Sequence, residues 1–394
     1  MVMNKQGLLL IGTVGLMIGG IDIYLAALPM LVDYFNTSPE FMQLTIMVSP
    51  LVSAIVSFFW GRQADLKCHK NLMLLSLFMF AFGVLICASS FNKWTFLFGR
   101  VVQSIGGSGL SNISIVLLYD VFKEEKEHAR YIALYGAMFP IVFALSPILG
   151  AQILVYLHWR MCFIFILLVS ILFYAGYYFW FEKSRQPKTS NAKAGSALPS
   201  LKRLLTNKLF MTLCIGHALP IAVSMLFTSN SSFIFQIFYG LNPTTYSVVQ
   251  CLPILLNFFG AFYYQYILEK HSINYTIKVA GYSVIVFVCG LVYLIIMPNE
   301  TFVPFLIIMG AFMFYMSFSI SSCMTKAIDS QKQDRGLAVA VTSTMRNGIG
   351  GAIVLGASFF YNATPDPMYM AMMITSIALI TVLLVIYPFL QKAK

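Results

Sequence analysis

The stretch Gly19-Gly-Ile-Asp-Ile-Tyr-Leu-Ala-Ala-Leu-Pro29 places an acidic side chain inside the first long apolar run of the chain. That run begins at about Gly7, and Asp22 lies roughly eight residues before its far end. A charge at the centre of a bilayer costs about 2.5–3.5 kcal/mol even on the mildest scale, so a chain that keeps one there usually uses it. The other acids lie in loops or at the ends of apolar runs. We therefore interpret Asp22 as the chemical centre of the molecule.

The composition around this run is that of a polytopic membrane protein. Of 394 residues, 59% are hydrophobic and 10% are charged, whereas soluble domains carry about 25% charged residues. The apolar runs are near-continuous rather than alternating, which predicts an all-α membrane protein and argues against a β-barrel. We expect no cleavable signal peptide, because the first run is long and lacks a small-residue cleavage site.

Twelve apolar runs follow one another along the chain, each long enough to cross ~30 Å of hydrocarbon. They cover approximately 7–30, 40–61, 71–90, 94–118, 128–155, 159–182, 208–230, 243–268, 274–297, 301–325, 337–361 and 367–390. The polar stretch Lys183–Lys208 divides them into six and six. We therefore expect an N-terminal six-helix bundle over 1–182, a cytoplasmic linker over 183–207 and a C-terminal bundle over 208–394.

The basic residues predict the orientation. With the N-terminus inside, most of the 25 Lys and Arg residues fall on the inner side, which places both termini and the linker in the cytoplasm of an inner-membrane protein. The net charge of +11 is then a topology signal, and the dispersal of the basic residues argues against a nucleic-acid partner. The seven Cys are scattered without metal or disulfide spacing, so we expect free thiols, no metal and no cofactor.

The two halves look related. The segments 123–130 and 329–335, each ending in Arg, precede the fifth and eleventh runs and lie about half the chain apart. Two parallel six-helix repeats around a site at the membrane midplane describe one large class of secondary transporters.

Two further charged stretches stand out. Gly61-Arg-Gln-Ala-Asp-Leu-Lys-Cys-His-Lys70 reads as a short loop suited to a charge clasp, in which Asp65 accepts hydrogen bonds from a neighbouring helix end. A plain basic cytoplasmic loop is the alternative.

In the fourth run, Arg100 and Gln103 share a helix face. Arg100 lies ~9 Å and Asp22 ~12 Å from the same membrane side, so a pair is geometrically possible. Two separate wet pockets remain the alternative.

The fifth, seventh and eleventh runs add kinks and polar side chains. Gly136–Pro140 and Ser146–Gly150 place prolines and small residues inside one helix, which kinks it and allows close packing. Arg346 lies about nine residues from the cytoplasmic end of its run; it is suited to neutralise a substrate anion or a helix end, or else to bind carbonyl groups. His217 is either a titrating group or a neutral packed histidine.

At these residues the chain resembles the major facilitator superfamily over nearly its whole length, and within it the Bcr/CflA-like drug–proton antiporters. Asp22-Ile-Tyr-Leu-Ala-Ala-Leu-Pro29 is similar to that group's first-helix signature D-x-Y-L-P-A-L-P, with Ala26 where proline is usual. Arg100-x-x-Gln103-x-x-Gly106 matches the fourth-helix pattern R-x-x-Q-x-x-G, which the resemblance connects with proton transfer.

Two more motifs carry the resemblance. The segment 61–70 is similar to the gating-loop pattern G-x-L-x-D-R-x-G-R-R/K, matching it at Gly61, Asp65 and Lys70 and departing at four other positions, so we expect a weakened charge relay. Pro147-Ile-Leu-Gly150 resembles the P-x-x-G core of the antiporter motif, with Ala151 in place of a second glycine.

The resemblance implies a proton-coupled secondary transporter that exports small, partly apolar compounds, including drugs, by alternating access between two pseudo-symmetric six-helix bundles. Asp22 is then the proton and cation site, with Arg100 modulating it. The partners are a small-molecule substrate, protons and the bilayer, and we expect a monomer. The candidates for the substrate cavity are Tyr24, Gln103, Phe139, His217, Phe227, Asn230, Gln250, Asn257 and Arg346.

Two other functions stay open. One is proton-coupled uptake of a metabolite or siderophore, which Arg346 and the altered gating loop favour. The other, from a different class, is a lipid flippase or a sensor without transport. We do not expect an enzyme, because no nucleophile–base spacing, metal set or phosphate loop appears outside the membrane.

Overall fold

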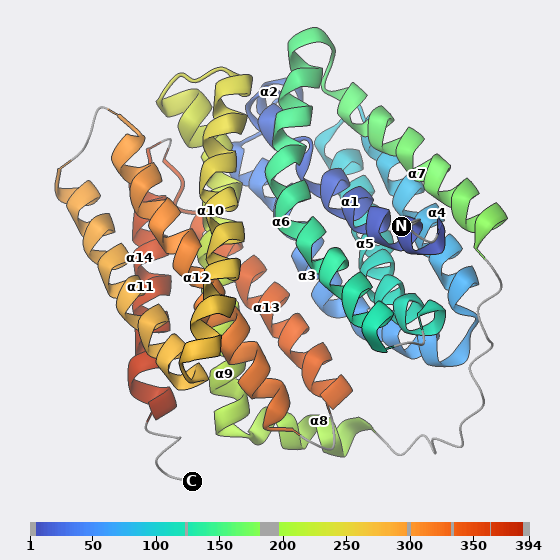
Figure 1. Ribbon diagram of the computed structural model, residues 1–394. Coiled ribbons are helices and arrows are strands. Elements are labelled where there is room, and N and C mark those ends of the chain that lie inside the picture. Colours follow the sequence, from blue (N-terminus) through green and yellow to red (C-terminus); the bar gives the residue numbers. More distant parts are fainter. Residues whose placement is uncertain are drawn as a thin grey trace. The chain divides into compact units, whose positions relative to one another are not determined.

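The computed structural model describes residues 5–122, 125–181, 197–297, 301–331, 335–362 and 364–388. Within these ranges the regular elements are all helices, which confirms the all-α prediction. The chain forms two compact units, Met1–Ala192 and Lys193–Lys394 (Figure 1).

The helices of the N-terminal unit begin at recognisable caps. Ser38 accepts a hydrogen bond from the backbone N–H of Phe41 at 3.4 Å, and Asn92 from that of Thr95 at 2.8 Å, as short polar residues do at helix N-termini. The unit contains α1 (Lys5–Asp22), the short 3-10 helix η1 (Leu25–Ala27), α2 (Leu28–Tyr34), α3 (Pro39–Leu66), α4 (His69–Ala88), α5 (Lys93–Val121), α6 (Glu125–Tyr156) and α7 (Arg160–Trp180).

The C-terminal unit uses the same device at Asn207, Asn242 and Ser272. Two of its helices end in π-helical turns, η2 and η3. Its elements are α8 (Ala197–Thr206), α9 (Lys208–Phe233), η2 (Ile234–Phe238), α10 (Pro243–Lys270), α11 (Ile273–Ile296), α12 (Val303–Asp329), α13 (Arg335–Ser358), α14 (Asp366–Ile380) and η3 (Thr381–Ile386).

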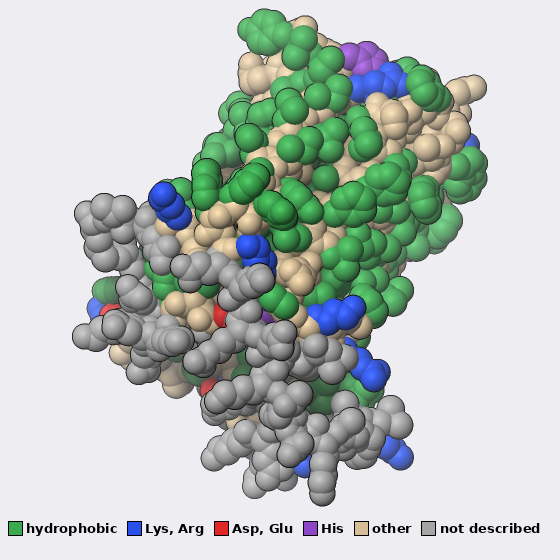
Figure 2. Space-filling view, turned by 90° about the vertical axis from the view of Figure 1, so that its right-hand side faces the viewer, with side chains coloured by type: hydrophobic (Ala, Val, Ile, Leu, Met, Phe, Trp, Pro, Cys, Tyr) green, Lys and Arg blue, Asp and Glu red, His purple; other side chains and the backbone are tan. Residues whose placement is uncertain are grey.

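Eleven helices in the described ranges are long and apolar enough to cross a membrane. The remaining long helix, α13, corresponds to the run predicted over 337–361; its glycines, threonines and Arg346 lower its apolar content. The lipid-facing character is visible in Figure 2, where hydrophobic side chains cover most of the described surface over α4 and α7. Phe78, Phe82, Leu172 and Phe179 are among the exposed apolar side chains of these two helices.

The two units repeat one pattern of helix pairing. In the first, α1 packs against α5, α6 and α7, α4 against α5 and α7, and α3 against α5. In the second, α9 packs against α12, α13 and α14, α11 against α12 and α14, and α10 against α12. Matched in chain order these are the same six pairs, as the twelve-helix repeat predicted from sequence requires.

The structure corrects one prediction and refines another. Residues 61–70 are not a loop: α3 continues to Leu66 and α4 begins at His69, so Gly61 and Asp65 lie in the last turns of α3. Polar residues end the apolar run there, but Arg, Gln, Ala and Leu are good helix formers and carry the helix onward. The predicted linker contains α8, while residues 182–196 lie outside the described residues.

Candidate functional site

The first membrane helix is broken directly after Asp22. α1 ends at that residue, a 3-10 turn follows over Leu25–Ala27, and α2 starts with Pro29 in its first turn. Proline is tolerated there because its missing N–H would be unpaired in any case. The break leaves the last carbonyl groups of α1 without all of their usual donors. Other helices must supply these donors, because the region is buried.

Two side chains of α5 meet one of these carbonyl groups. The Gly20 carbonyl oxygen accepts hydrogen bonds from Gln103 Nε2 at 2.9 Å and from Arg100 Nη1 at 3.3 Å. Arg100 Nη1 also donates to Gln103 Oε1 at 2.6 Å, which fixes the two side chains together. A cation at a helix C-terminus is favourable, by up to about 2 kcal/mol in partly buried geometries. Arg100 and Gln103 therefore cap the broken helix.

The rest of the Arg100 side chain is bound as well. Nε donates to the Thr45 carbonyl oxygen at 3.3 Å and Nη2 to Ser49 Oγ at 3.2 Å. The guanidinium lies over the ring of Tyr24, 4.6 Å from its centroid, and the Tyr24 hydroxyl pairs with Thr45 Oγ1 at 2.9 Å. A fully buried cation is tolerable only with such partners. Arg100, with no exposed surface, is held by α1, α3 and its own helix.

Asp22 has a different environment. The residue is only 5% exposed, and among the described residues of its unit no hydrogen bond or ion pair reaches its carboxylate. Arg100 is close enough to act on it electrostatically. The direct ion pair considered from matching depths is thus absent in this conformation, because Arg100 binds backbone and neutral side chains instead. Asp22 is a buried acid beside a cation that is already occupied.

The antiporter-motif glycine packs on the same break. A Cβ atom at Gly150 of α6 would lie 1.7 Å from the carbonyl oxygen of Ile23, the residue after Asp22. Only glycine permits so close an approach without movement. Pro140 and Pro147 lie inside the same helix. The motif residues Pro147 and Gly150 therefore belong to the helix that contacts the chain beside Asp22.

In the C-terminal unit the candidates lie on several helices. His217 on α9 is 2% exposed, and its Nδ1 lies 3.0 Å from the Ile320 carbonyl oxygen, to which it must donate. Arg346 on α13 is half-buried and donates through Nε to Asn347 Oδ1 at 3.2 Å. Gln250 is 1% exposed, and neither polar atom of its amide has a hydrogen-bond partner within the part of the chain that the structure describes. A ligand that pairs with this amide would remove a penalty of about 1–3 kcal/mol per unpaired group.

Several other candidates are engaged in packing. Asn257 Nδ2 donates to the Met313 carbonyl oxygen at 2.9 Å, joining α10 to α12, and Asn230 Nδ2 donates to the Leu226 carbonyl oxygen of its own helix at 2.9 Å. Phe227 has no exposed surface, and Phe139 is 38% exposed. Tyr24, Gln103 and Phe227 are therefore enclosed within their units in this conformation and support their surroundings.

The residues around the junction of α3 and α4 form contacts that the sequence did not reveal. Lys70 Nζ donates to the carbonyl oxygens of Tyr178, at 3.1 Å, and Phe181 at the end of α7. His69 Nδ1 lies 2.6 Å from Asp120 Oδ2 of α5, and its Nε2 lies 2.8 Å from the Ala64 carbonyl oxygen. The Asp65 side chain lies outside the described residues. The sequence analysis missed the pair of His69 and Asp120. The available signal was Asp120, an acid at the end of the fourth run, together with the basic segment that contains His69.

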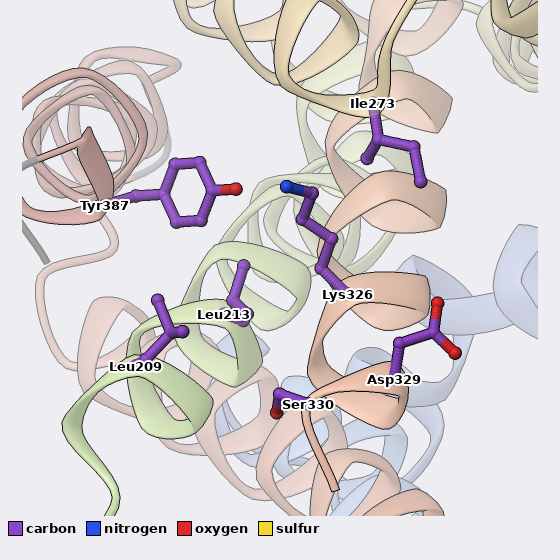
Figure 3. A pocket seen from close by; sticks show the side chains of 7 residues that line it. All are labelled: Leu209, Leu213, Ile273, Lys326, Asp329, Ser330 and Tyr387. Carbon is purple, nitrogen blue, oxygen red and sulfur yellow. The ribbon is translucent and has the colours of Figure 1, made fainter. Parts of the chain in front are cut away.

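One hollow of about 390 Å³ lies at helix ends rather than at mid-depth (Figure 3). Lys326 and Tyr387 face each other across it, and both bind Asn274 Oδ1, the tyrosine at 2.8 Å. The Lys326 ammonium is thus already paired with a neutral acceptor. The hollow is lined by Leu209, Leu213, Ile273, Lys326, Asp329, Ser330 and Tyr387. The site around Asp22 and the polar groups of α9, α10 and α13 lie elsewhere in the fold.

Comparison with solved structures shows the fold. The chain is similar to a mutant form of the nucleoside transporter NupG, with a TM-score of 0.78 and 11% identity, covering 97% of this chain and 100% of that one. A bacterial homologue of the human lysosomal transporter Spinster gives a TM-score of 0.71 at 13% identity, covering 98% and 95% of the two chains.

Curated relatives are transporters too. The efflux pump dotC of Dothistroma septosporum is 30% identical over 42% of this chain and 28% of its own length. The multidrug resistance protein MdtL of Salmonella dublin is 23% identical over 59% of this chain and 58% of its own. The matches thus span less than two thirds of these relatives. The model of the Major Facilitator Superfamily, however, matches residues 10–355, and the chain belongs to that superfamily of membrane transporters.

Proposed function

We propose that the protein couples the movement of protons to the export of small, partly apolar compounds across the inner membrane. The observation that carries the proposal is Asp22, a buried acid to which no described residue of its unit donates a hydrogen bond, placed at the end of a broken membrane helix. Proton uptake removes its charge, so the two protonation states differ strongly in how well a closed, dry site tolerates them. The relatives named as an efflux pump and as a multidrug resistance protein support the outward direction.

The geometry offers a route from protonation to movement. Asp22 lies between the capped C-terminus of α1 and the 3-10 turn, and Gly150 of α6 packs against the intervening Ile23. A change in the charge of Asp22 therefore acts directly on the contact between α1 and α6. Alternating access requires such a group to favour different arrangements in its two states. Binding of the substrate and binding of the proton would then favour different arrangements of the two bundles.

The proposal includes an orientation and an oligomeric state. Both termini and residues 183–207 face the cytoplasm, following the distribution of Lys and Arg. The domain boundaries proposed from sequence, 1–182 and 208–394, define the two bundles that move. We propose a monomer as the working unit.

Uptake by proton symport is the second candidate. Arg346, a cation in the middle of α13 with one hydrogen bond to a described residue, suits a carrier of acidic metabolites as well as an exporter. Accumulation measured in energised vesicles of known orientation separates the two: export predicts loss of substrate from the cytoplasmic side, and symport predicts gain.

Asp22→Asn is the decisive variant. The amide keeps the size of the carboxyl group but cannot bind or release a proton. We expect it to fold, to keep binding a compound identified by a thermal-shift screen, and to lose accumulation driven by a proton gradient in proteoliposomes. Asp33→Asn, at an exposed acid near the end of α2, is the matched control and should transport normally. If Asp22→Asn still concentrates substrate and releases protons on binding it, Asp22 is structural and the proposal is wrong.

A further inference from the structure

Arg346 lies deep within its helix. It is the twelfth of the 24 residues of α13, so about 16–18 Å of helix separates it from either end. A cation at this depth in a membrane protein normally faces a partner or a functional pathway. The neighbouring contacts show which side of α13 carries it.

The side chain projects toward α9. Thr342, one turn before Arg346, pairs with Cys214 of α9 at 3.4 Å, and a Cβ atom at Gly350, one turn after, would lie 2.6 Å from Met225 Sδ of α9. Residues spaced by four share a helix face. Arg346 therefore lies level with the α9 segment between Cys214 and Met225. His217 belongs to that segment, and Arg346 is close enough to act on it electrostatically.

Most of the hydrogen-bonding capacity of Arg346 is unused. A guanidinium carries five N–H donors, and in the described part of the C-terminal unit the single hydrogen bond found for it is Nε to Asn347 Oδ1. Arg100, by comparison, donates to the Thr45 and Gly20 carbonyls and to Ser49 and Gln103. The two terminal nitrogens of Arg346 thus remain available, and the residue is half-buried rather than enclosed.

The described acids of the same unit do not neutralise Arg346. Glu269 lies at the end of α10, Asp329 at the end of α12 and Asp366 at the start of α14, and none of them forms an ion pair with Arg346. His217 donates through Nδ1 to a carbonyl group and contributes no negative charge. The positive charge of Arg346 is therefore not neutralised by any acid among the described residues of its unit.

We propose that Arg346 binds the acidic group of the transported substrate, which makes that substrate a small organic acid with an apolar body. The inference rests on the proposed function, since it assumes that the protein is a carrier. The planar fork of two terminal nitrogens fits the two oxygens of a carboxylate. Beside it, Met225 is partly exposed on α9, and methionine adapts to apolar groups of varied shape.

Matched pairs of acid and amide test the proposal. The probes are 4-phenylbutyrate with 4-phenylbutyramide, and indole-3-acetate with indole-3-acetamide, added to the purified full chain at constant ionic strength. We expect the acids to raise the melting temperature and their amides to have little effect. Arg346→Gln should weaken acid binding at least tenfold, and Arg346→Lys should retain part of it, because lysine keeps the charge without the fork. Lys326→Gln, at the helix-end hollow, should bind like the wild type.

Three results would overturn the proposal: equal binding of acids and amides, unchanged acid binding by Arg346→Gln, or no response of the wild type to any acid in the panel. Arg346→Glu adds a test that does not depend on the folding of the glutamine variant. This variant should no longer prefer the acids and should instead bind the cation 4-phenylbutylamine. The outcome is separable from proton coupling. Asp22→Asn should still bind acids, so loss of gradient-driven transport with intact acid preference would leave this inference standing.

Discussion

Two arginines of this chain show how differently one residue type is used inside a membrane. Arg100 donates to backbone and side-chain oxygens from α1, α3 and α5 and has no exposed surface. Arg346 is half-buried and forms one hydrogen bond with the residues that the structure describes. The first arrangement belongs to a structural cap with an electrostatic effect on Asp22. The second leaves donors for a ligand.

This contrast gives a stability prediction for a matched pair of variants. Arg100→Gln should lower the melting temperature clearly, because it removes the hydrogen bonds from a charged donor to the Gly20 and Thr45 carbonyls and to the Ser49 hydroxyl, each worth about 1.5–3 kcal/mol. Arg346→Gln should change it little. Thermal unfolding of both variants in one detergent checks this, and equal losses would mean that the hydrogen bonds of Arg100 are not what holds the break in α1.

Sequence reasoning singled out the candidate residues of this site without reaching their contacts. Asp22, Arg100 and Gln103 were identified from charge, depth and helix face. The Gly20 carbonyl, to which both Arg100 and Gln103 donate, could not be identified from sequence. Every residue carries a carbonyl group, and the need of this one for a donor appears only once the helix is known to break. The unpaired amide of Gln250 likewise depends on three-dimensional neighbours.

At the scale of elements, close approaches and charge pairs at helix ends position the helices. Gly150 lets α6 contact the carbonyl of Ile23. Lys70 caps α7, and His69 joins the end of α3, through the Ala64 carbonyl, to Asp120 on α5. The contacts of Lys70 and His69 connect α3, α4, α5 and α7 at one end of the N-terminal unit, and Gly150 joins α6 to the break after α1.

Gly150→Ala tests the close approach. Its added methyl group overlaps the Ile23 carbonyl oxygen, so α6 or the break must move, at a cost of about 1–3 kcal/mol. Transport should fall with stability, since Asp22 adjoins the displaced residue. Gly356→Ala is the control, because a Cβ atom there meets nothing within 4 Å and the residue lies in a helix, where alanine is favoured by about 1 kcal/mol. Normal stability and transport by Gly150→Ala would contradict the packing argument.

The contact between His69 and Asp120 gives a stability prediction. His69 Nδ1 faces the Asp120 carboxylate and Nε2 faces the Ala64 carbonyl group, so the imidazole joins the ends of α3 and α5. His69→Ala removes both contacts and should lower the melting temperature, at about 0.5–1.5 kcal/mol for each hydrogen bond lost. His69→Gln should lose less, because its amide can still reach one of the two partners. Thermal unfolding of both variants at one pH checks this, and a His69→Ala variant as stable as the wild type would show that these contacts do not hold the helix ends together.

Element boundaries were the weaker part of the sequence analysis for a physical reason. Hydropathy detects where apolar side chains stop, and hydrogen bonding decides where helices stop. α3 therefore extends past Gly61, and the run over 7–30 contains a break that apolar Leu25, Ala26 and Ala27 conceal. Pro29 was the available sign of a new helix start. The twelve runs themselves were predictable, because each must cross the same hydrocarbon thickness.

At the scale of the whole molecule, repetition and charge organise the chain. The same six helix pairs occur in both units, yet the buried acid lies in the first unit and the available cation in the second. The repeat therefore supplies the scaffold, while the chemistry differs between the halves. This division was visible in sequence, since charged residues inside apolar runs are few and easily located.

The proposed orientation predicts a labelling pattern. A cysteine introduced between 186 and 200 should react with a membrane-impermeant maleimide in inverted vesicles and stay unreactive in intact cells. Cys289 is exposed and Cys68 partly so, so both should first be replaced by serine. Labelling in intact cells would place this segment outside and overturn the topology.

The break in α1 also has an electrical consequence. Counted from Gly7 toward Pro29, Asp22 lies about two-thirds of the way along the apolar run, so on the proposed orientation most of the membrane's thickness separates it from the cytoplasm. A proton arriving from outside crosses the smaller part of the transmembrane field, and one leaving inward crosses the larger part. With about 2.3 kcal/mol available per charge for each 100 mV, the membrane voltage acts mainly on proton release to the cytoplasm. The pH difference across the membrane then remains as the principal force that protonates Asp22 from outside.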